Sequence, residues 1–267
     1  MNFLAGLRDD DPEENSVELN IYYIPPEKKG IPNSHKPYRI SFVEDSNGGC
    51  SVRRLVEKKG RKYDRNGVRY TDETYACAAT RVFFQITKSI KAKEITFEMN
   101  PMRPEVERVL KEHPTTRKFL CEEFLIRTED RALPPLLLRF LSPGTKLDVY
   151  SNPFPEPGDI FIDTAFFDSD VVRAAPKFDT EALTGVTEEQ FVLLQADELS
   201  MKAPHISSKA INRILLVRLV EKPLSFFTSP TVCFGVRTPA GLYFKGVESW
   251  ASESEEGALN TARIELH

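Results

Sequence analysis

Tryptophan, histidine and long apolar runs are scarce in this sequence. It has one Trp, four His and four Cys among 267 residues. The cysteines at 50, 77, 121 and 233 show no C-x-x-C spacing and have no histidine at ligand spacing, which disfavours a zinc site and favours reduced thiols. Residues 1–7 lack the basic region of a signal peptide and the length of a transmembrane helix. These absences predict a cytoplasmic or nuclear protein without a membrane partner.

Catalytic signatures are also missing. The sequence contains no G-x-S-x-G, no G-x-G-x-x-G and no P-loop, so it gives no indication of a nucleophilic or nucleotide-binding site. We therefore expect no enzyme activity and no cofactor. The formal net charge of −4 disfavours nucleic acid as the partner of the whole chain, because phosphate binding needs concentrated positive charge.

The hydrophobic content of 40% supports an ordinary core in an α+β or α/β fold. Residues 1–15 are rich in acids and predict a flexible acidic arm. Residues 16–92 predict an antiparallel β meander, with a hairpin turn at Asn47-Gly48-Gly49, followed by an amphipathic helix capped by Asp72 or Thr71. An apolar stripe marks that helix: Tyr75, Ala79, Val82, Phe83, Ile86 and Ile90.

Strand and helix patterns alternate in residues 93–248. Strands are predicted at 94–99, 124–127, 146–150, 160–162 and 198–202, and helices at 104–112, 133–141 and 187–194, the last with a capping box at Thr187 and Gln190. Central strand residues recur at the size of leucine-rich repeats: Ile95, Phe124, Leu147, Leu199 and Leu224. We predict irregular leucine-rich-repeat-like units here, one of them obscured in 151–186, and a C-terminal tail at 249–267.

The stretch 198–220 predicts a strand, a turn and a helix capped by Ser207 or Ser208. Ile211, Ile214, Leu215 and Leu219 form the expected buried stripe of this helix, and Asn212 is expected to bond locally or to cap a neighbouring turn. The outer side remains for contact with a partner, and it carries His205, Lys209, Asn212 and Arg213.

Two segments carry a resemblance to a known family. Leu199-Ser-Met201 followed by Ile206-Ser-Ser-Lys-Ala-Ile-Asn-Arg-Ile-Leu215, together with the stretch from Val82 to Phe97, resembles the F-box-associated domains that are expanded in nematodes. The similarity covers about residues 75 to 235. It implies a non-catalytic module that recognises substrates for a ubiquitin ligase adaptor. Residues 17–71 predict strands rather than a helical F-box, so the resemblance implies a substrate-facing half without its ligase-facing half, or a diverged relative with another role.

Two alternatives to a protein partner stay open. The run 53–69 is basic and carries two interleaved tyrosines, which suits a nucleic-acid patch or an exposed hairpin tip. The basic residues of this nucleic-acid patch would be Arg53, Arg54, Lys58, Lys59, Arg61 and Lys62. The second alternative is a metal-assisted hydrolase that uses the acids Asp159, Asp163, Asp168 and Asp170, although alternating acids at strand ends are common on solvated loops.

Overall fold

The computed structural model describes residues 2–9, 16–24, 38–58, 61–65, 67–151, 159–213, 233–234, 244–245 and 264–265. The chain divides into two compact units, residues 1–142 and 143–267. Both are mixed α/β, with parallel and antiparallel strands, which confirms the broad fold class predicted from the sequence. No helix in these described ranges is long and apolar enough to cross a membrane.

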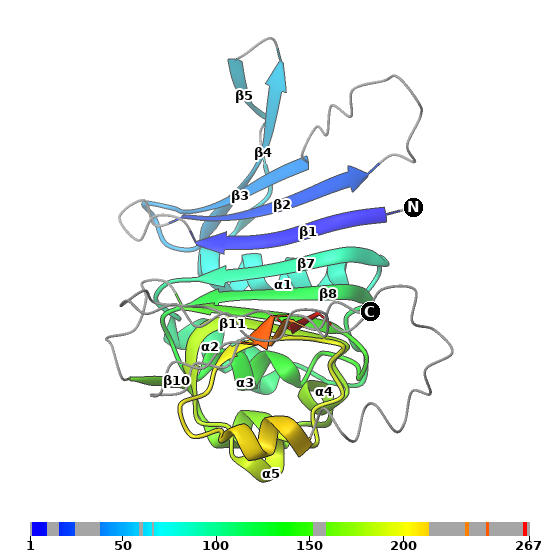
Figure 1. Cartoon of the computed structure of the whole chain (residues 1–267). Helices are drawn as coiled ribbons and strands as arrows, with labels where there is room; N and C mark the ends of the chain where they lie inside the picture. Colours follow the sequence, from blue (N-terminus) through cyan, green and yellow to red (C-terminus); the bar gives the residue numbers. More distant parts are fainter. Residues whose placement is uncertain are drawn as a thin grey trace, which may run out of the picture. The chain divides into compact units, whose positions relative to one another are not determined.

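The first unit is built on one mixed sheet (Figure 1). Its strands are β1 (Asn2–Asp9), β2 (Ser16–Ile24), β3 (Tyr38–Glu44), β4 (Cys50–Lys58), β5 (Arg61–Arg65), β6 (Arg69–Tyr70), β7 (Ala92–Met99) and β8 (Cys121–Thr128). Their order in the sheet is β8-β7-β1-β2-β3-β4-β5, and β6 also pairs with β4. The pairs β1–β7 and β7–β8 are parallel, whereas the pairs from β1 to β5 are antiparallel.

The predicted flexible arm at 1–15 is wrong for residues 2–9, which form β1 near the middle of the sheet. Ala5 and Leu7 are fully buried there. The acidic residues begin only at Asp9, so an apolar strand precedes them. Burial of these side chains and pairing on both edges offset the cost of ordering the strand. Residues 10–15 lie outside the described ranges.

The meander of β2 to β5 confirms the antiparallel prediction for this part of the chain. Its hairpin turn falls at the predicted glycines, where Gly48 has φ 83° and Gly49 φ 80°. A Cβ at Gly49 would lie 2.1 Å from the carbonyl oxygen of Tyr70. Both the left-handed backbone and the close approach therefore require glycine.

Three helices accompany this sheet: α1 (Tyr75–Thr87), α2 (Pro104–Glu112) and α3 (Leu133–Leu138). The amide of Cys77 donates to Thr74 Oγ1 at 3.3 Å, so Thr74 caps α1 in place of the predicted Asp72 or Thr71. α2 has the predicted bounds. α3 is three residues shorter than predicted, and its two prolines stand in the first turn, where no intrahelical N–H is lost.

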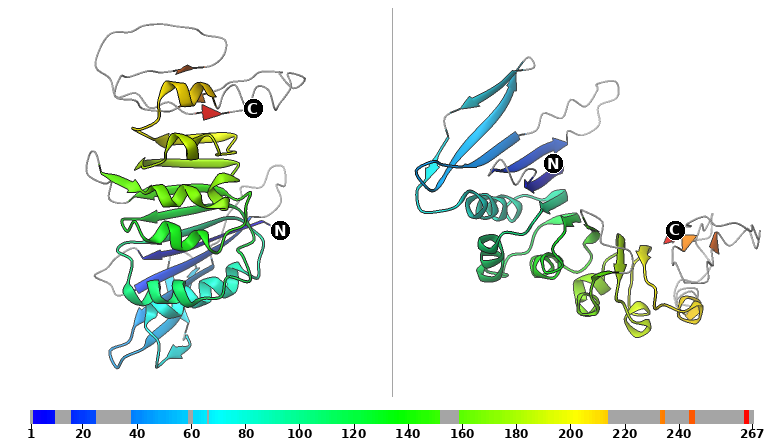
Figure 2. Two further views of the ribbon diagram at one scale, coloured as in Figure 1. Left: turned by 90° about the horizontal axis from the view of Figure 1, so that it is seen from below. Right: turned by 90° about the vertical axis from the view of Figure 1, so that its left-hand side faces the viewer.

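An aromatic cluster joins these helices to the strands. Phe83 of α1 lies 5.5 Å from Phe97 of β7 and 5.8 Å from Phe119, between ring centroids. Phe119 stacks on Phe124 of β8 at 5.5 Å. The helices thus cover one face of the first unit's sheet, as the side view shows (Figure 2).

The second unit has a parallel core of three strands. Its strands are β9 (Lys146–Ser151), β10 (Ile160–Ile162), β11 (Lys177–Thr184), β12 (Glu198–Lys202) and β15 (Ile264–Glu265), in the order β15-β12-β11-β9 with β10 also on β11. β13 (Cys233–Phe234) and β14 (Phe244–Lys245) form a separate pair. The helices are η1 (Thr164–Asp168), α4 (Asp170–Arg173), α5 (Glu188–Phe191) and the helical residues 208–213.

Two predictions for this unit need correction. The sequence patterns missed β11, which lies inside the obscured stretch 151–186 and pairs Phe178 with both Leu147 and Leu199. Its buried positions alternate but are filled partly by Thr180, Ala182 and Thr184, so the apolar signal is weak. The predicted tail is wrong at Ile264 and Glu265, which pair with β12. Leu224, Trp250 and the end of the helix after Arg213 lie outside the described residues.

Candidate functional site

Each sheet has a face that the helices leave uncovered, which we call the open face. Along β7, Ile95, Phe97 and Met99 are fully buried toward the helices. Successive side chains of a strand point to opposite faces, so Glu94, Thr96 and Glu98 lie on the open face. The same alternation places Glu123, Leu125 and Arg127 of β8 there. The open face is therefore mainly polar, whereas the opposite face is the core.

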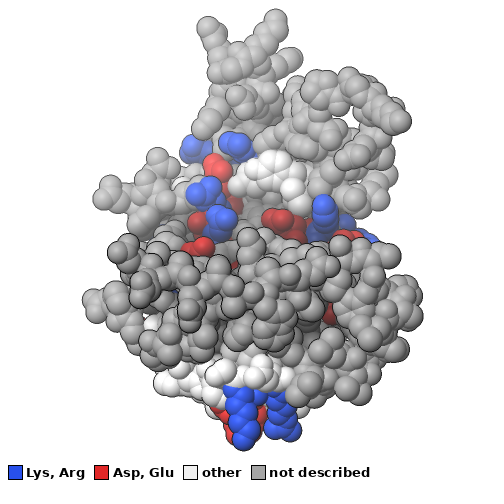
Figure 3. All heavy atoms as spheres, viewed as in Figure 1, with Lys and Arg blue, Asp and Glu red and all other residues white. Residues whose placement is uncertain are grey.

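Arg8, Glu98 and Arg127 form a row across the open face of the first unit, in register on β1, β7 and β8. Glu98 Oε2 lies 3.3 Å from Arg8 Nε and 3.8 Å from Arg127 Nη1. The Glu98 side chain is 9% exposed, whereas the two arginine side chains are 54% and 45% exposed. Two arginine side chains therefore contact one carboxylate. Basic and acidic side chains intermingle on this face (Figure 3).

A second polar cluster lies on the open face of the second unit. Lys177 Nζ donates to Asp148 Oδ2 at 2.9 Å, and the Tyr150 hydroxyl donates to Asp179 Oδ2 at 3.4 Å. Asp148 and Asp179 are register partners on β9 and β11. Burial, and then the nearby carboxylates of Asp179 and Asp148, raise the pKa of Tyr150 to about 12. The two carboxylates of the cluster thus hold the Lys177 ammonium and the Tyr150 hydroxyl.

The residues predicted to meet a partner after β12 are exposed. Lys209, Asn212 and Arg213 share one helix face at spacings of three and four, and His205 stands in the preceding turn. The amide of Ala210 donates to Ser207 Oγ at 3.3 Å, which confirms Ser207 as the cap. Asn212 makes none of the expected local hydrogen bonds with described residues.

Glu188 of α5 ties the turn before this helix to the second unit. Its Oε1 accepts a hydrogen bond from the amide of Ser207 at 3.0 Å. Hydrogen bonding with Ser207, helped by the charge of Lys209, lowers the pKa of Glu188. The helix start is therefore fixed while its outer side stays open to solvent.

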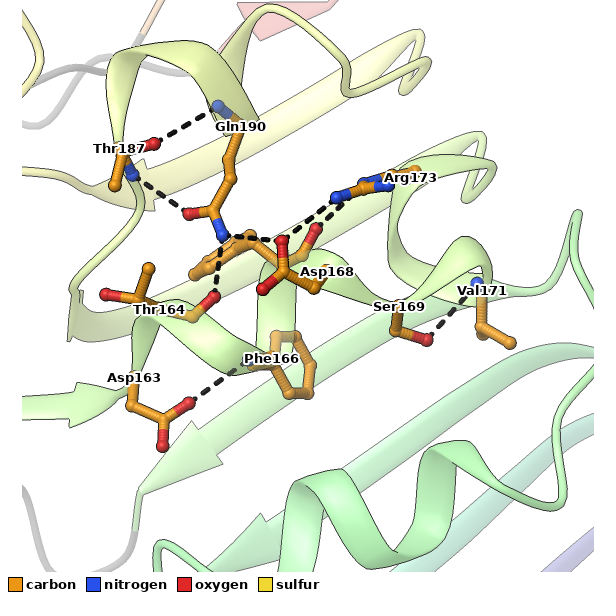
Figure 4. A network of polar contacts seen from close by, with 10 residues as sticks. Asp163, Thr164, Phe166, Asp168, Ser169, Val171, Arg173, Thr187 and Gln190 are labelled. Atoms are coloured by element: carbon orange, nitrogen blue, oxygen red, sulfur yellow. Dashed lines mark hydrogen bonds and ion pairs between the residues drawn. The ribbon is translucent and has the colours of Figure 1, made fainter.

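Two of the acids proposed for a hydrolase, Asp163 and Asp168, have structural roles (Figure 4). Asp163 Oδ1 accepts from the amide of Phe166 at 3.1 Å and so caps η1. Asp168 Oδ1 accepts from Arg173 Nη2 and from Gln190 Nε2, each at 2.9 Å. Asp170 opens α4. Among the described residues, no group of three or more His, Cys, Asp or Glu could hold a metal ion.

The basic run at 53–69 lies mostly on β4 and β5. The side chains of Arg53 and Arg54 are exposed, and the Arg54 guanidinium lies 4.2 Å from the centre of the Tyr38 ring. Lys58, Arg61 and Lys62 stand in the paired part of the two strands, and Lys59 falls outside the described residues. The structure thus brings the run together as one hairpin.

Burial shifts the pKa values of His113, Cys50 and Cys121. His113 stacks on Phe84 at 4.4 Å, and burial lowers its pKa, with the nearby Lys88 charge acting in the same direction. Burial raises the pKa of the Cys50 thiol, and that of Cys121 to about 12. High thiol pKa values disfavour the reactive thiolate. His35 lies outside the described residues.

The open-face residues were missed by sequence reasoning. The alternation in 94–99 already separates Glu94, Thr96 and Glu98 from the apolar positions. The polar positions of this correctly predicted strand could therefore have indicated part of the open face. No such signal links Arg8 to Glu98, which lie in contact but far apart in the chain.

Comparisons of this chain with protein-family models, curated proteins and solved structures find no match.

Proposed function

We propose that this chain is a non-catalytic protein-interaction module that binds another protein through the open face of its strands. The Arg8–Glu98–Arg127 row carries the proposal. Arginine is enriched where interfaces bind most tightly, and here two exposed arginines are held on strands by a buried carboxylate. Side chains held this way lose little freedom on binding, which favours affinity.

The proposal includes a leucine-rich-repeat-like organisation of each unit. β7, α2 and β8 form one strand–helix–strand step with parallel neighbours, and β11, α5 and β12 form another. Central residues pair across the steps at offsets of 29 residues for Ile95 and Phe124, and 21 for Phe178 and Leu199. Repeats of this size bury one face against their neighbours and leave a surface for partners.

The placement of the acids supports binding over hydrolysis. Asp163 accepts the hydrogen bond that caps η1, and Asp168 accepts hydrogen bonds from Arg173 and Gln190. The two carboxylates do not converge on a common point. A metal-assisted hydrolase needs carboxylates that share one ion or one water. Asp163 and Asp168 therefore serve better as scaffold than as catalysts.

By the family resemblance, the partner is a protein presented to a ubiquitin ligase. The exposed helix face with Lys209, Asn212 and Arg213 falls in the segment that carries this resemblance, and we propose it as a separate contact made by the second unit. Recovery of ligase subunits together with the partner would support this role. Recovery of the partner with no ligase subunit would remove the ligase from the proposal and keep the binding function.

Affinity purification with two matched variants tests the proposal. Arg127→Ala removes an exposed arginine from the open face but leaves Glu98 paired with Arg8, and Arg108→Ala removes an exposed arginine from α2. We expect specific partners to remain with Arg108→Ala and to fall at least ~10-fold with Arg127→Ala, as at a binding hot spot. Equal losses with both variants, or no specific partner together with reproducible turnover of a small substrate, would contradict the proposal.

A further inference from the structure

The C-terminal ends of the three helices of the first unit are joined by side chains. Lys88, His113 and Arg139 are the residues that directly follow α1, α2 and α3. Lys88 Nζ donates to the carbonyl of Pro114 at 3.0 Å and lies 3.2 Å from His113 Nδ1. Arg139 Nη1 donates at 3.3 Å to the carbonyl of Lys111, in the last turn of α2. The cations that follow α1 and α3 therefore both lie at the end of α2.

Two further cations come from the loop after α2. Lys118 Nζ donates to the carbonyl of Arg139. The pKa of Lys88 is lowered by burial and then by the charges of Lys118 and Arg117. We call Lys88, Arg117, Lys118 and Arg139 the helix-end cluster. Within the described ranges, none of the four forms an ion pair with an acid.

Aromatic rings of the core support this cluster. Lys88 Nζ lies 5.0 Å from the centre of the Phe84 ring and 5.1 Å from that of Phe140. The guanidinium carbon of Arg139 lies 6.0 Å from the centre of Phe140. Both rings are fully buried, and their centres are 4.6 Å apart. Cations held on packed rings lose little freedom when they bind a ligand.

The helix ends alone do not account for this much positive charge. The C-terminus of a helix carries roughly half a negative charge, so three of them supply about −1.5 against the four cations. The remainder of about +2.5 is more than one carboxylate neutralises, and it suits a phosphate group of charge about −2.

Hydrogen-bond donors also remain in the cluster. A lysine ammonium has three N–H groups and a guanidinium has five. The printed contacts of Lys88 use at most two of its donors, and those of Lys118 and Arg139 use one each. Arg117 is exposed and donates no hydrogen bond to the described residues. Several N–H groups on neighbouring cations match the oxygens of a phosphate group, which arginine binds in a bidentate manner.

We propose that the helix-end cluster binds a phosphate group, either as free phosphate or as a phosphate monoester. Arg117 supplies the bidentate contact, and Lys88 and Lys118 neutralise the second charge. The site belongs to the helices, which cover the opposite face of the sheet from the Arg8–Glu98–Arg127 row. It therefore does not depend on a protein bound to the open face.

The test is isothermal titration calorimetry of the full chain with inorganic phosphate, N-acetyl-phosphoserine amide and acetate. Arg117→Gln removes a cation of the cluster, and Arg108→Gln removes an exposed cation from α2 as the matched control. We expect Arg117→Gln to weaken phosphate binding at least ~10-fold, as for loss of a charged hydrogen bond, and Arg108→Gln to weaken it less than ~2-fold. Acetate should bind at least ~10-fold more weakly than phosphate, because it carries one charge and two oxygens.

The two phosphate probes identify the source of the group. Tighter binding of the phosphoserine derivative indicates a monoester, and tighter binding of inorganic phosphate indicates the free anion. Equal losses with the two variants, acetate that binds as tightly as phosphate, or no binding of either phosphate probe up to ~10 mM would overturn the proposal.

Proton NMR of the histidine rings locates the anion. Saturating inorganic phosphate should raise the pKa of His113, because a nearby negative charge favours the protonated ring. His205, in the second unit, is the control and should titrate as before. Arg117→Gln should remove the shift at His113 while keeping the melting temperature, because its side chain is exposed. An unchanged pKa of His113, or an equal shift at His205, would place the anion elsewhere and contradict the proposal.

Discussion

At the scale of single residues, the ion pair of Lys177 and Asp148 differs from a surface ion pair because both side chains are largely buried. Their side chains are 18% and 11% exposed and lie 2.9 Å apart. Lys177→Met leaves the carboxylate without this cation and should lower the free energy of unfolding by about 3 kcal/mol, measured by urea titration. Lys177→Met/Asp148→Leu should recover most of that loss.

The control for this pair is Lys111, which pairs with Glu107 one helical turn away on α2 and is 58% exposed. Lys111→Met should cost less than about 0.5 kcal/mol, because solvent screens the pair. Similar losses for Lys177→Met and Lys111→Met would show that the Asp148 site is as well solvated as the surface.

Tyr150 makes the stability of the second unit depend on pH in an alkaline window. Its pKa is raised from 10.0 to about 12 in the folded chain, first by burial and then by the carboxylates of Asp179 and Asp148. The folded chain keeps the proton where the unfolded chain has lost it. The contribution of Tyr150 is thus complete below pH 10 and is lost as the pH rises through 12.

Tyr150→Phe should therefore flatten the dependence of the unfolding free energy on pH between 10 and 12. Urea titrations of wild type and variant below and within this window measure the difference. If the unfolding free energies of the two proteins depend on pH in the same way, the raised pKa of the Tyr150 hydroxyl is contradicted.

At the scale of elements, α1 is held by aromatic packing. Phe83 is fully buried and contacts Phe84, Phe97 and Phe119. Phe83→Ala should cost about 3–5 kcal/mol, from lost burial and the cavity that remains. The neighbouring Val82 is only half-buried, so Val82→Ala should cost clearly less in the same urea titration. A loss below about 1 kcal/mol for Phe83→Ala would mean that the cluster does not hold the helix.

The start of α5 depends on a capping box joined to η1. The amide of Gln190 donates to Thr187 Oγ1 at 3.2 Å, and the amide of Thr187 donates to Gln190 Oε1 at 3.1 Å. Gln190 Nε2 also donates to the carbonyl of Thr164 at 3.0 Å. Thr187→Ala should cost about 1 kcal/mol, whereas Gln190→Ala should cost about 2–3 kcal/mol because it also frees η1.

A thermal melting series of the two single variants and the double variant checks this claim. The double variant should lose less than the sum of the singles, because Thr187 and Gln190 share two hydrogen bonds. Simple additivity would show that the two residues act separately.

Elements with a strong local pattern were predictable from the sequence. The alternation of β7 and β12, the amphipathic pattern of α2 and the capping box of α5 each specify an element within a few residues. β11 was not predicted because threonine and alanine fill buried positions at which a strand pattern has larger apolar residues. β1 was not predicted because the acidic residues that follow it dominate the composition of the first fifteen residues.

At the scale of the whole molecule, the open face was not predictable from local patterns. Glu98 meets Arg8 and Arg127 only because β7 lies between β1 and β8. That neighbourhood is set by pairing of distant segments, and no spacing in the chain records it. The helix face with Lys209, Asn212 and Arg213 was predictable, because it needs only the local helical period.

The central claim is that a protein partner contacts the open face of the strands. Incorporation of the photo-cross-linker p-benzoylphenylalanine at Leu125, on the open face, and at Arg108, exposed on α2, tests it most directly in cell extract. We predict covalent adducts with another protein from position 125 and not from position 108. Adducts from position 108 alone, or only internal cross-links from position 125, would contradict the claim.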